Sequence, residues 1–309
     1  MTASILEELT RFGPDARATP PPTLAEAQRY CQRLGKTHYE NFTVASWLLP
    51  RRLRQHFFNV YAYCRWADDL ADETADARRS LELLDWWERQ LADCYCGETR
   101  HPVFVALADT IATFSIPIDP FRDLLTAFRQ DQRQTRYETF DDLLGYCRHS
   151  ANPVGRIVLY LGRCVNDENV RLSDSICTGL QLANFCQDVA RDFARGRIYL
   201  PRESWQRFGY DETTFARRVC NEPFRQMLKY EVMRAGHYLE SGWPLVAQLP
   251  RELRIPVALF VRGGCAILSA IVGQNYDVWS RRPIVRAKLS LFVSVLIPYL
   301  LGGLSADDF

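Results

Sequence analysis

Hydrophobic residues recur along this chain at intervals of three and four positions, with polar residues between them, from Thr23 onward. This period is typical of amphipathic helices, because positions i, i+3, i+4 and i+7 share one helix face. No stretch alternates apolar and polar residues between turn signals, so the pattern predicts no strand. It predicts an all-α fold with helices at 1–12, 24–34, 50–72, 76–96, 102–114, 119–131, 140–149, 153–163, 170–194, 213–249 and 251–277, and a further segment that runs through Trp47.

Prolines mark the main interruption of this pattern. They crowd residues 14–22, and proline cannot continue a helix because it lacks the amide donor. We interpret residues 1–22 as an N-terminal extension with a proline-rich strap. No linker or fixed-period repeat divides the helices that follow, which favours a single helical domain over 23–288. Residues 289–309 form an apolar C-terminal helix and tail.

Composition narrows the class of protein. The 309 residues are 47% hydrophobic and 24% charged, with a net charge of +1 and no separate basic block. This balance gives no sign of a nucleic-acid partner. The ten cysteines are scattered without C-x-x-C or zinc spacing, which predicts reduced thiols in a cytoplasmic protein. The first thirty residues lack the unbroken apolar core of a signal peptide.

The helix predicted around residues 180–192 carries oxygen-bearing side chains one turn apart. Asn184, Asp188 and Asp192 are separated by four positions and therefore share one face. The opposite side is covered by Leu182, Phe185, Cys186, Val189, Ala190 and Phe193. Taken alone, this polar face is also explained by simple solvation.

A second helix of this kind lies more than a hundred residues earlier. Asp68 and Asp69 are each one turn from Asp72, although stacked like charges destabilise a helix by roughly 0.2–0.5 kcal/mol per pair. Their repetition in two helices predicts a bound cation. Carboxylate and amide oxygens suit Mg²⁺, which completes its shell with water and substrate phosphate. Arg65 lies one turn before Asp68 and Asp69, and an ion pair with one of them along the helix is enough to account for it.

Two further stretches leave alternatives open. Pro153 pushes Asn152 out of the α region, so a helix ends or kinks there, either toward a cavity or for packing. Arg281, Arg282, Arg286 and Lys288 lead into the apolar run 289–304. At about 16 residues this run is shorter than the roughly 20 that span a bilayer. A peripheral membrane contact and burial against the helices both explain it.

The stretches VYAYCRWADDLADE (60–73) and LQLANFCQDVARDFARGRIYLP (180–201) resemble the squalene/phytoene synthase family, the head-to-head branch of the trans-prenyltransferases. The likeness covers most of the chain, from Lys36 to Arg286. It implies an isoprenoid-synthase helical bundle with a central apolar cavity. In that family the two acidic helices face each other and hold Mg²⁺ on a prenyl diphosphate.

The resemblance also implies roles for single residues. The metal ligands would be Asp68, Asp69, Asp72, Asn184, Asp188 and Asp192. Arg65 and Arg281 resemble arginines that contact diphosphate, Tyr146 resembles an active-site tyrosine, and Phe42 an aromatic residue of the cavity. The other candidate substrate-binding residues are His38, Asn41, Tyr61, Asn152, Gln181, Phe185 and Tyr276.

Departures from the condensing enzymes of the family point to a subgroup. The chain has Glu40-Asn41 where those enzymes commonly carry serine and lysine, and Asn152-Pro153-Val154-Gly155 at their alanine–glycine break. These features resemble the bacterial hydroxysqualene synthases. That subgroup converts presqualene diphosphate to hydroxysqualene with Mg²⁺ and without NADPH, which makes it a carbon–oxygen lyase. A sister protein supplies presqualene diphosphate, and a flavin-dependent reductase uses the alcohol.

Two rival functions are considered. One is a condensing enzyme that joins two farnesyl or geranylgeranyl diphosphates to presqualene diphosphate, squalene or phytoene. The other is a non-catalytic assembly factor of the same fold, although both acidic sets are complete here. In each case the expected location is the cytoplasm, with a peripheral contact at the inner membrane surface through the C-terminal region.

Overall fold

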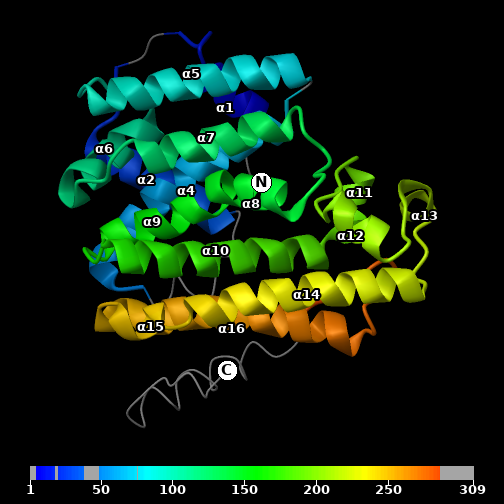
Figure 1. Ribbon diagram of the computed structural model, residues 1–309. Helices are drawn as coiled ribbons and strands as arrows, with labels where there is room; N and C mark the ends of the chain where they lie inside the picture. Colours follow the sequence, from blue (N-terminus) through cyan, green and yellow to red (C-terminus); the bar gives the residue numbers. More distant parts are fainter. Residues whose placement is uncertain (1–4, 18–19, 38–48, 75, 286–309) are drawn as a thin grey trace. The chain divides into compact units, whose positions relative to one another are not determined.

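The periodic hydrophobic pattern folds into helices in the part of the chain that the structure describes. The computed structural model (Figure 1) describes residues 5–17, 20–37, 49–74 and 76–285. Within these ranges there is no strand, only an isolated bridge between Arg136 and Ile198. The predicted all-α class is confirmed. The chain divides into two compact units, residues 1–133 and 134–309.

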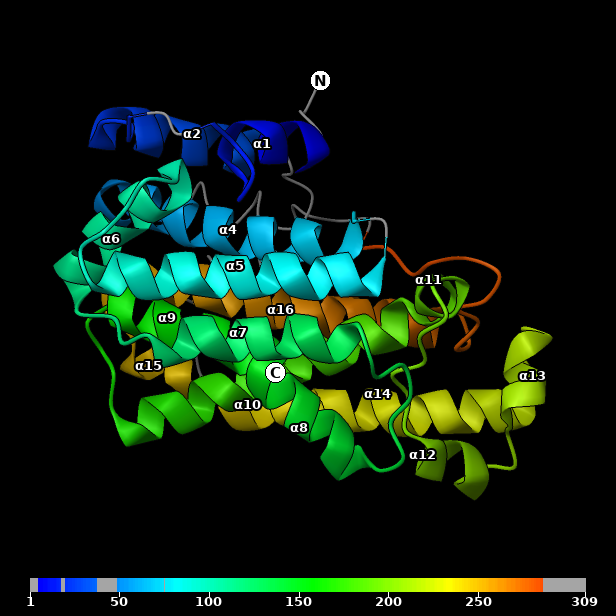
Figure 2. The ribbon, with the colours of Figure 1, turned by 90° about the horizontal axis from the view of Figure 1, so that it is seen from above.

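The first unit is built around one long helix, α4, which packs against α1, α2, α5, α6 and α7; Figure 2 shows α5 running alongside it. Its centre is aromatic: Trp66 stacks on Trp87 with ring centroids 5.2 Å apart, and His101 stands edge-on to both. Burying such rings supplies much of the stability of a core. The helices of this unit are α1 (Ile5–Phe12), α2 (Leu24–Thr37), α4 (Arg51–Asp72), α5 (Ala77–Tyr95), α6 (Pro102–Phe114) and α7 (Asp119–Asp131).

In the second unit, α10, α14 and α16 run side by side (Figure 1). Glycine allows the closest approach: a Cβ on Gly179 would lie 2.8 Å from the backbone nitrogen of Leu239. The helices of this unit are α8 (Phe140–Ser150), α9 (Asn152–Leu161), α10 (Asp167–Gln187), α11 (Val189–Ala194), α12 (Arg202–Arg207), α13 (Glu212–Ala216), α14 (Glu222–Gly242), α15 (Leu245–Gln248) and α16 (Arg251–Gly273).

The prediction of one helix over 213–249 is wrong, because three helices occupy this range. Asn221 accepts a hydrogen bond from the Phe224 amide at 3.1 Å and caps the start of α14, with Pro223 in its first turn. Pro244 then separates α14 from α15. A capping asparagine followed by proline begins a helix more readily than it continues one.

Other boundaries differ less. The helix predicted over 170–194 is interrupted at Asp188, α12 was not predicted, and α16 ends at Gly273 rather than at residue 277. The segment predicted to run through Trp47 and the apolar run 289–304 lie outside the described residues. The proposed domain boundaries at 22/23 and 288/289 stay predictions.

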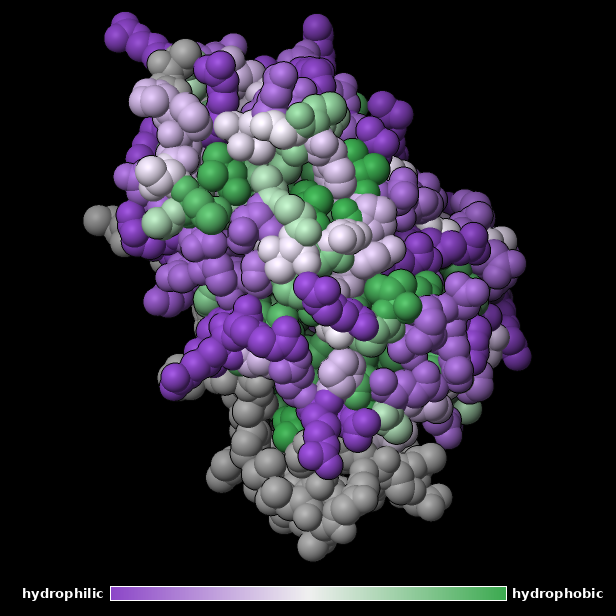
Figure 3. All heavy atoms as spheres, turned by 90° about the vertical axis from the view of Figure 1, so that its left-hand side faces the viewer, coloured by the Kyte–Doolittle hydropathy of each residue, from purple (hydrophilic) through white to green (hydrophobic). Residues whose placement is uncertain are grey.

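Apolar surface is scattered over the described residues. The exposed large hydrophobic side chains are Leu6, Leu24, Val154, Val165, Val219, Met233, Val272 and Ile284. Figure 3 shows one face, where hydrophobic residues form small groups among polar ones. Among the helices in the described ranges, α16 is long and apolar enough to cross a membrane, and 39% of its apolar window is buried. Core helices meet the same criterion, so this helix does not by itself indicate a membrane protein.

Candidate active site

The first acidic motif ends helix α4. The helix runs unbroken to Asp72, which places Asp68 and Asp72 one turn apart, and the Glu73 amide donates to the Asp69 carbonyl at 2.9 Å. Asp69 is buried, Asp68 is half-buried and Asp72 is exposed. The motif therefore presents carboxylates in a range from desolvated to fully hydrated.

Arg65 lies among these carboxylates. Its guanidinium forms an ion pair with Asp69 and approaches Asp68 and Glu73, each at 3.4 Å. Burial raises the pKa of Asp69 to about 7, and Glu73 and Asp68 add to this rise while Arg65 opposes it. The ion pair along the helix is present, and Arg65 does not fully offset the desolvation of Asp69.

The last turn of α4 is held by side chains from α5, from the residue after α7 and from the turn that follows α4. The Ala71 carbonyl accepts from Ser80 Oγ at 3.2 Å and from Gln132 Nε2 at 3.1 Å, and the Leu70 carbonyl accepts from Thr74 Oγ1 at 3.2 Å. The final carbonyls of a helix have no partners within the helix. These bonds satisfy two of them and fix the backbone that carries the motif.

The second acidic motif lies where α10 gives way to α11. Asp188 is the residue between the two helices, yet its amide donates to the Asn184 carbonyl and its carbonyl accepts from the Asp192 amide, both at 2.9 Å. The three side chains therefore still follow one another turn by turn. Asn184 is exposed, Asp192 is half-buried and Asp188 is buried, so the face they share is not simply a solvated one.

Arg282 is the partner of the buried Asp188. Its guanidinium donates to the two carboxylate oxygens at 2.5 and 2.9 Å and to Gln187 Oε1 at 3.1 Å, and Gln187 Nε2 donates to the Pro283 carbonyl at 2.7 Å. Such bidentate pairs are among the stronger polar contacts. Sequence reasoning chose the neighbouring Arg281, which is exposed and lies beside the amide of Gln274. Nothing in the local sequence separates the two arginines.

Asp192 adds a second desolvated carboxylate. Burial raises its pKa to about 7, and the negative charge of Asp188 adds to this rise. Arg195, Arg197 and Arg191 oppose it without cancelling it. A cation bound beside Asp192 would stabilise its charged form.

An aromatic cluster accompanies the second motif. Phe185 of α10 stacks on Tyr199 with ring centroids 4.1 Å apart, and Tyr146 of α8 lies 5.6 Å from Tyr199 and 6.1 Å from Phe185. Tyr137 completes the group at 5.6 Å from Tyr146 and 5.8 Å from Tyr199. Sequence reasoning found Tyr146 and Phe185 but missed the other two tyrosines.

Backbone pairing brings the missed tyrosines together. The Ile198 amide donates to the Thr135 carbonyl at 2.9 Å, and the Arg202 amide donates to the Tyr137 carbonyl at 2.8 Å. The segment before α8 is thereby held beside the segment after α11. The motif RIYLP, quoted above for its likeness to the family, already contains Tyr199, so a signal for this residue was available.

The helix break at Asn152 serves packing. Asn152 lies in the first turn of α9, is buried, and accepts a hydrogen bond from Thr178 Oγ1 of α10 at 3.0 Å. One turn on, a Cβ at Gly155 would lie 2.3 Å from Ser173 Oγ. The two helices therefore meet closely at this point, and the side-chain oxygen of Asn152 is already engaged.

The remaining candidates lie on different elements or outside the described residues. Tyr61 is on α4, where burial raises its pKa, and Gln181 is on α10. Tyr276 follows α16 with a positive φ of 60°, and its carbonyl accepts from Cys220 Sγ at 3.9 Å. The other three, His38, Asn41 and Phe42, lie outside the described residues.

The donor set fits Mg²⁺. Within the described residues, no three His, Cys, Asp or Glu side chains form a complete metal site. Mg²⁺ does not need one, because it binds through one or two carboxylates together with water and substrate phosphate. Each motif holds a carboxylate that is withdrawn from water, Asp69 and Asp192, and burial raises the pKa of both. A divalent cation would stabilise the charged form of each.

The all-α fold and the two acidic helix motifs define an isoprenoid synthase. The chain belongs to the squalene/phytoene synthase family, whose sequence model matches residues 35–292. It is therefore an enzyme of isoprenoid biosynthesis in this family.

Three similar proteins represent the family. The 15-cis-phytoene synthase of Synechocystis is 33% identical over 91% of this chain and 87% of its own. The squalene synthase HpnC of Alicyclobacillus acidocaldarius is 44% identical, with a TM-score of 0.79 over 82% of this chain and 95% of its own. The structure of a dehydrosqualene synthase with a bound ligand is 27% identical, with a TM-score of 0.82 over 91% and 98% of the two chains.

Proposed function

We propose that this chain is a hydroxysqualene synthase, which converts presqualene diphosphate and water to hydroxysqualene and diphosphate. The observation that carries this proposal is the pair of acidic motifs, each with a buried carboxylate beside an arginine. Such a set suits departure of a diphosphate from an allylic or cyclopropylcarbinyl carbon. The 44% identity to HpnC and the sequence Asn152-Pro153-Val154-Gly155 favour the hydroxysqualene subgroup.

The carboxylates would bind the metal and the arginines the anion. Mg²⁺, when bound, neutralises the diphosphate and assists its departure. Asp68, Asp69, Asp72, Asn184, Asp188 and Asp192 are the proposed ligands. Arg65 and Arg282 hold carboxylates. A guanidinium that no longer binds its carboxylate could pair with a diphosphate oxygen.

The aromatic cluster would stabilise the carbocation. The carbon–oxygen bond breaks with its electron pair on the diphosphate, and the cation left behind rearranges. The π-faces of Tyr146, Phe185 and Tyr199 attract positive charge in a site from which water is largely excluded. One water oxygen then bonds to the cation and passes its proton to the diphosphate. No hydride is consumed, so NADPH is not required.

A second candidate is the condensation of two prenyl diphosphates. It is favoured by the relatives at 32% and 33% identity, which are phytoene synthases. The same acidic motifs would serve this reaction, since it also begins with loss of diphosphate. A non-catalytic assembly factor is a third candidate, which needs neither motif.

Product analysis by mass spectrometry tests these proposals. Purified protein is incubated with Mg²⁺ and, in separate reactions, with presqualene, farnesyl or geranylgeranyl diphosphate, without NADPH. We expect hydroxysqualene from presqualene diphosphate only. Turnover of the two shorter substrates without any hydroxysqualene would instead establish a condensing enzyme, and no turnover of any substrate would favour the assembly factor.

A matched pair of variants links turnover to the motif. We expect Asp188→Asn to abolish diphosphate release. Asp174→Asn removes an equally paired carboxylate in the same unit, which binds Arg156 at 2.6 and 3.0 Å, and should retain turnover. Equal activity in both variants would contradict the proposed role of Asp188.

A further inference from the structure

The N-terminal segment contacts residues that flank the first acidic motif in sequence, Trp66 before it and Arg79 after it. Helix α1 and the turn after it belong to the same unit as α4. The family match begins at residue 35, so α1 and most of α2 precede the matched region. Whatever this segment does is therefore additional to the matched part of the chain.

The first contact is a buried relay of hydrogen bonds. Tyr30 Oη donates to Glu8 Oε2 at 2.8 Å and accepts from Trp66 Nε1 at 3.0 Å. All three residues are buried. Burial and the Glu8 carboxylate keep the pKa of Tyr30 well above its ordinary value, so the phenol stays a donor. Trp66 lies one turn before Asp69 on α4, and the relay therefore fixes how α4 is rotated where it presents its carboxylates.

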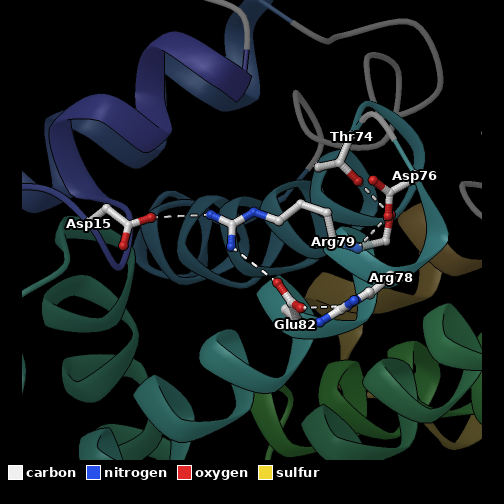
Figure 4. Close-up of polar contacts among 7 residues, drawn as sticks. Asp15, Thr74, Asp76, Arg78, Arg79 and Glu82 are labelled. Carbon is white, nitrogen blue, oxygen red and sulfur yellow. Dashed lines mark hydrogen bonds and ion pairs between the residues drawn. The ribbon is translucent and has the colours of Figure 1, made fainter.

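The second contact lies after the first acidic motif in the sequence, at the start of α5. Asp15 forms an ion pair with Arg79 at 3.2 Å, and the Arg79 amide donates to Asp76 Oδ1, the N-cap of α5, at 2.8 Å. Figure 4 shows Asp15 pointing to the Arg79 guanidinium, with Glu82 on its other side. The side chain of Asp15 is 87% exposed, and exposed pairs contribute little to stability.

Burial decides which of the two contacts holds α4 more firmly. A buried donor or acceptor that loses its partner is costly, because water cannot replace the lost bond. Removing the Tyr30 hydroxyl takes this partner from the Trp66 indole N–H and from Glu8 Oε2, while Glu8 Oε1 keeps its ion pair with Arg11 at 3.7 Å. The relay therefore resists rotation of α4 far more than the surface pair does.

We propose that Glu8 and Tyr30 are positioning residues for the metal ligands Asp68, Asp69 and Asp72, and that they act through Trp66. Helix α1 and the first half of α2 then act as a strut, a rigid support that holds the first acidic motif in its binding geometry. This inference rests on the proposed Mg²⁺ binding by that motif.

Mn²⁺ binding to the intact chain tests the strut. Free Mn²⁺ is measured by electron paramagnetic resonance in wild type, Tyr30→Phe, Glu8→Ala and Glu8→Gln, and hydrogen exchange is followed over residues 66–74. We expect Tyr30→Phe to bind Mn²⁺ about fivefold more weakly, as the loss of one buried hydrogen bond implies, and to exchange faster over 66–74. Glu8→Gln keeps an oxygen acceptor and should restore most of the binding that Glu8→Ala loses.

Tyr95→Phe is the matched control. Tyr95 Oη donates to the Ile116 carbonyl at 2.9 Å in the same unit, at the end of α5 away from its N-cap. Equal Mn²⁺ binding by folded Tyr30→Phe, Tyr95→Phe and wild type would overturn the strut and leave the proposed function standing. Absence of Mn²⁺ binding in the wild type would overturn both. Should Tyr30→Phe not fold, Glu8→Ala, which keeps the bond between Tyr30 and Trp66, decides the question.

Discussion

Replacing Arg282 by glutamine removes the counter-ion of a carboxylate that is only 12% exposed. Two hydrogen bonds to Asp188, at 2.5 and 2.9 Å, are lost together with the bond to Gln187. Breaking a fully buried pair costs about 3–5 kcal/mol. The Arg282 side chain is 38% exposed, so water screens this pair, and we expect the free energy of unfolding to fall by about 1–3 kcal/mol.

Mg²⁺ should reverse part of this loss. A metal ion at Asp188 supplies the positive charge that Arg282→Gln lacks, and a ligand that binds the folded state stabilises it by mass action. Urea unfolding with and without Mg²⁺ measures the effect. We expect the difference between Arg282→Gln and wild type to shrink when Mg²⁺ is present.

Arg156→Gln is the control for this experiment. It breaks a bidentate pair with Asp174 of similar length and exposure in the same unit, but Asp174 belongs to neither acidic motif. We expect a comparable loss of stability that Mg²⁺ does not reverse. A loss in Arg282→Gln that is unchanged by Mg²⁺, or no loss at all, would refute the reasoning.

Three further predictions concern packing, pH and catalysis. Gly179→Ala should lower the free energy of unfolding by about 2 kcal/mol, because the new Cβ would meet the Leu239 backbone at 2.8 Å. Gly236→Ala, whose Cβ would make only an ordinary contact at 3.8 Å, should raise it by roughly 0.5–1 kcal/mol. Urea unfolding measures both changes. Burial lowers the pKa of His101 to about 3. Between about pH 6.5 and pH 3 the unfolded state therefore binds a proton that the folded state does not, and the contribution of His101 to stability falls by about 1.4 kcal/mol per pH unit. The raised pKa values of Asp69 and Asp192 act in the opposite direction, so the effect is measured as the difference in slope between wild type and His101→Asn. Tyr199→Leu removes the ring 4.1 Å from Phe185 and should lower turnover about tenfold in steady-state assays.

Much of the secondary structure was predictable because helical periodicity is a local property. The bounds of α6 and α7 match the prediction residue for residue, and α4 is one residue shorter. The prediction of one helix over 213–249 failed although Asn221, Pro223 and Pro244 were visible in the sequence. The helical spacing of apolar residues continued across the whole range and outweighed these short capping signals. The α10–α11 interruption at Asp188 carries no such signal.

The sequence by itself determined the all-α class, the two acidic motifs with their one-turn spacing, and the family, because each depends on residues close together in the chain. Only the tertiary structure decided that Arg282 rather than Arg281 holds Asp188, that Tyr199 stacks on Phe185, and that Tyr30 links Glu8 to Trp66. Most of these partners lie far apart in sequence. Their pairing depends on how whole helices pack, which local periodicity does not specify.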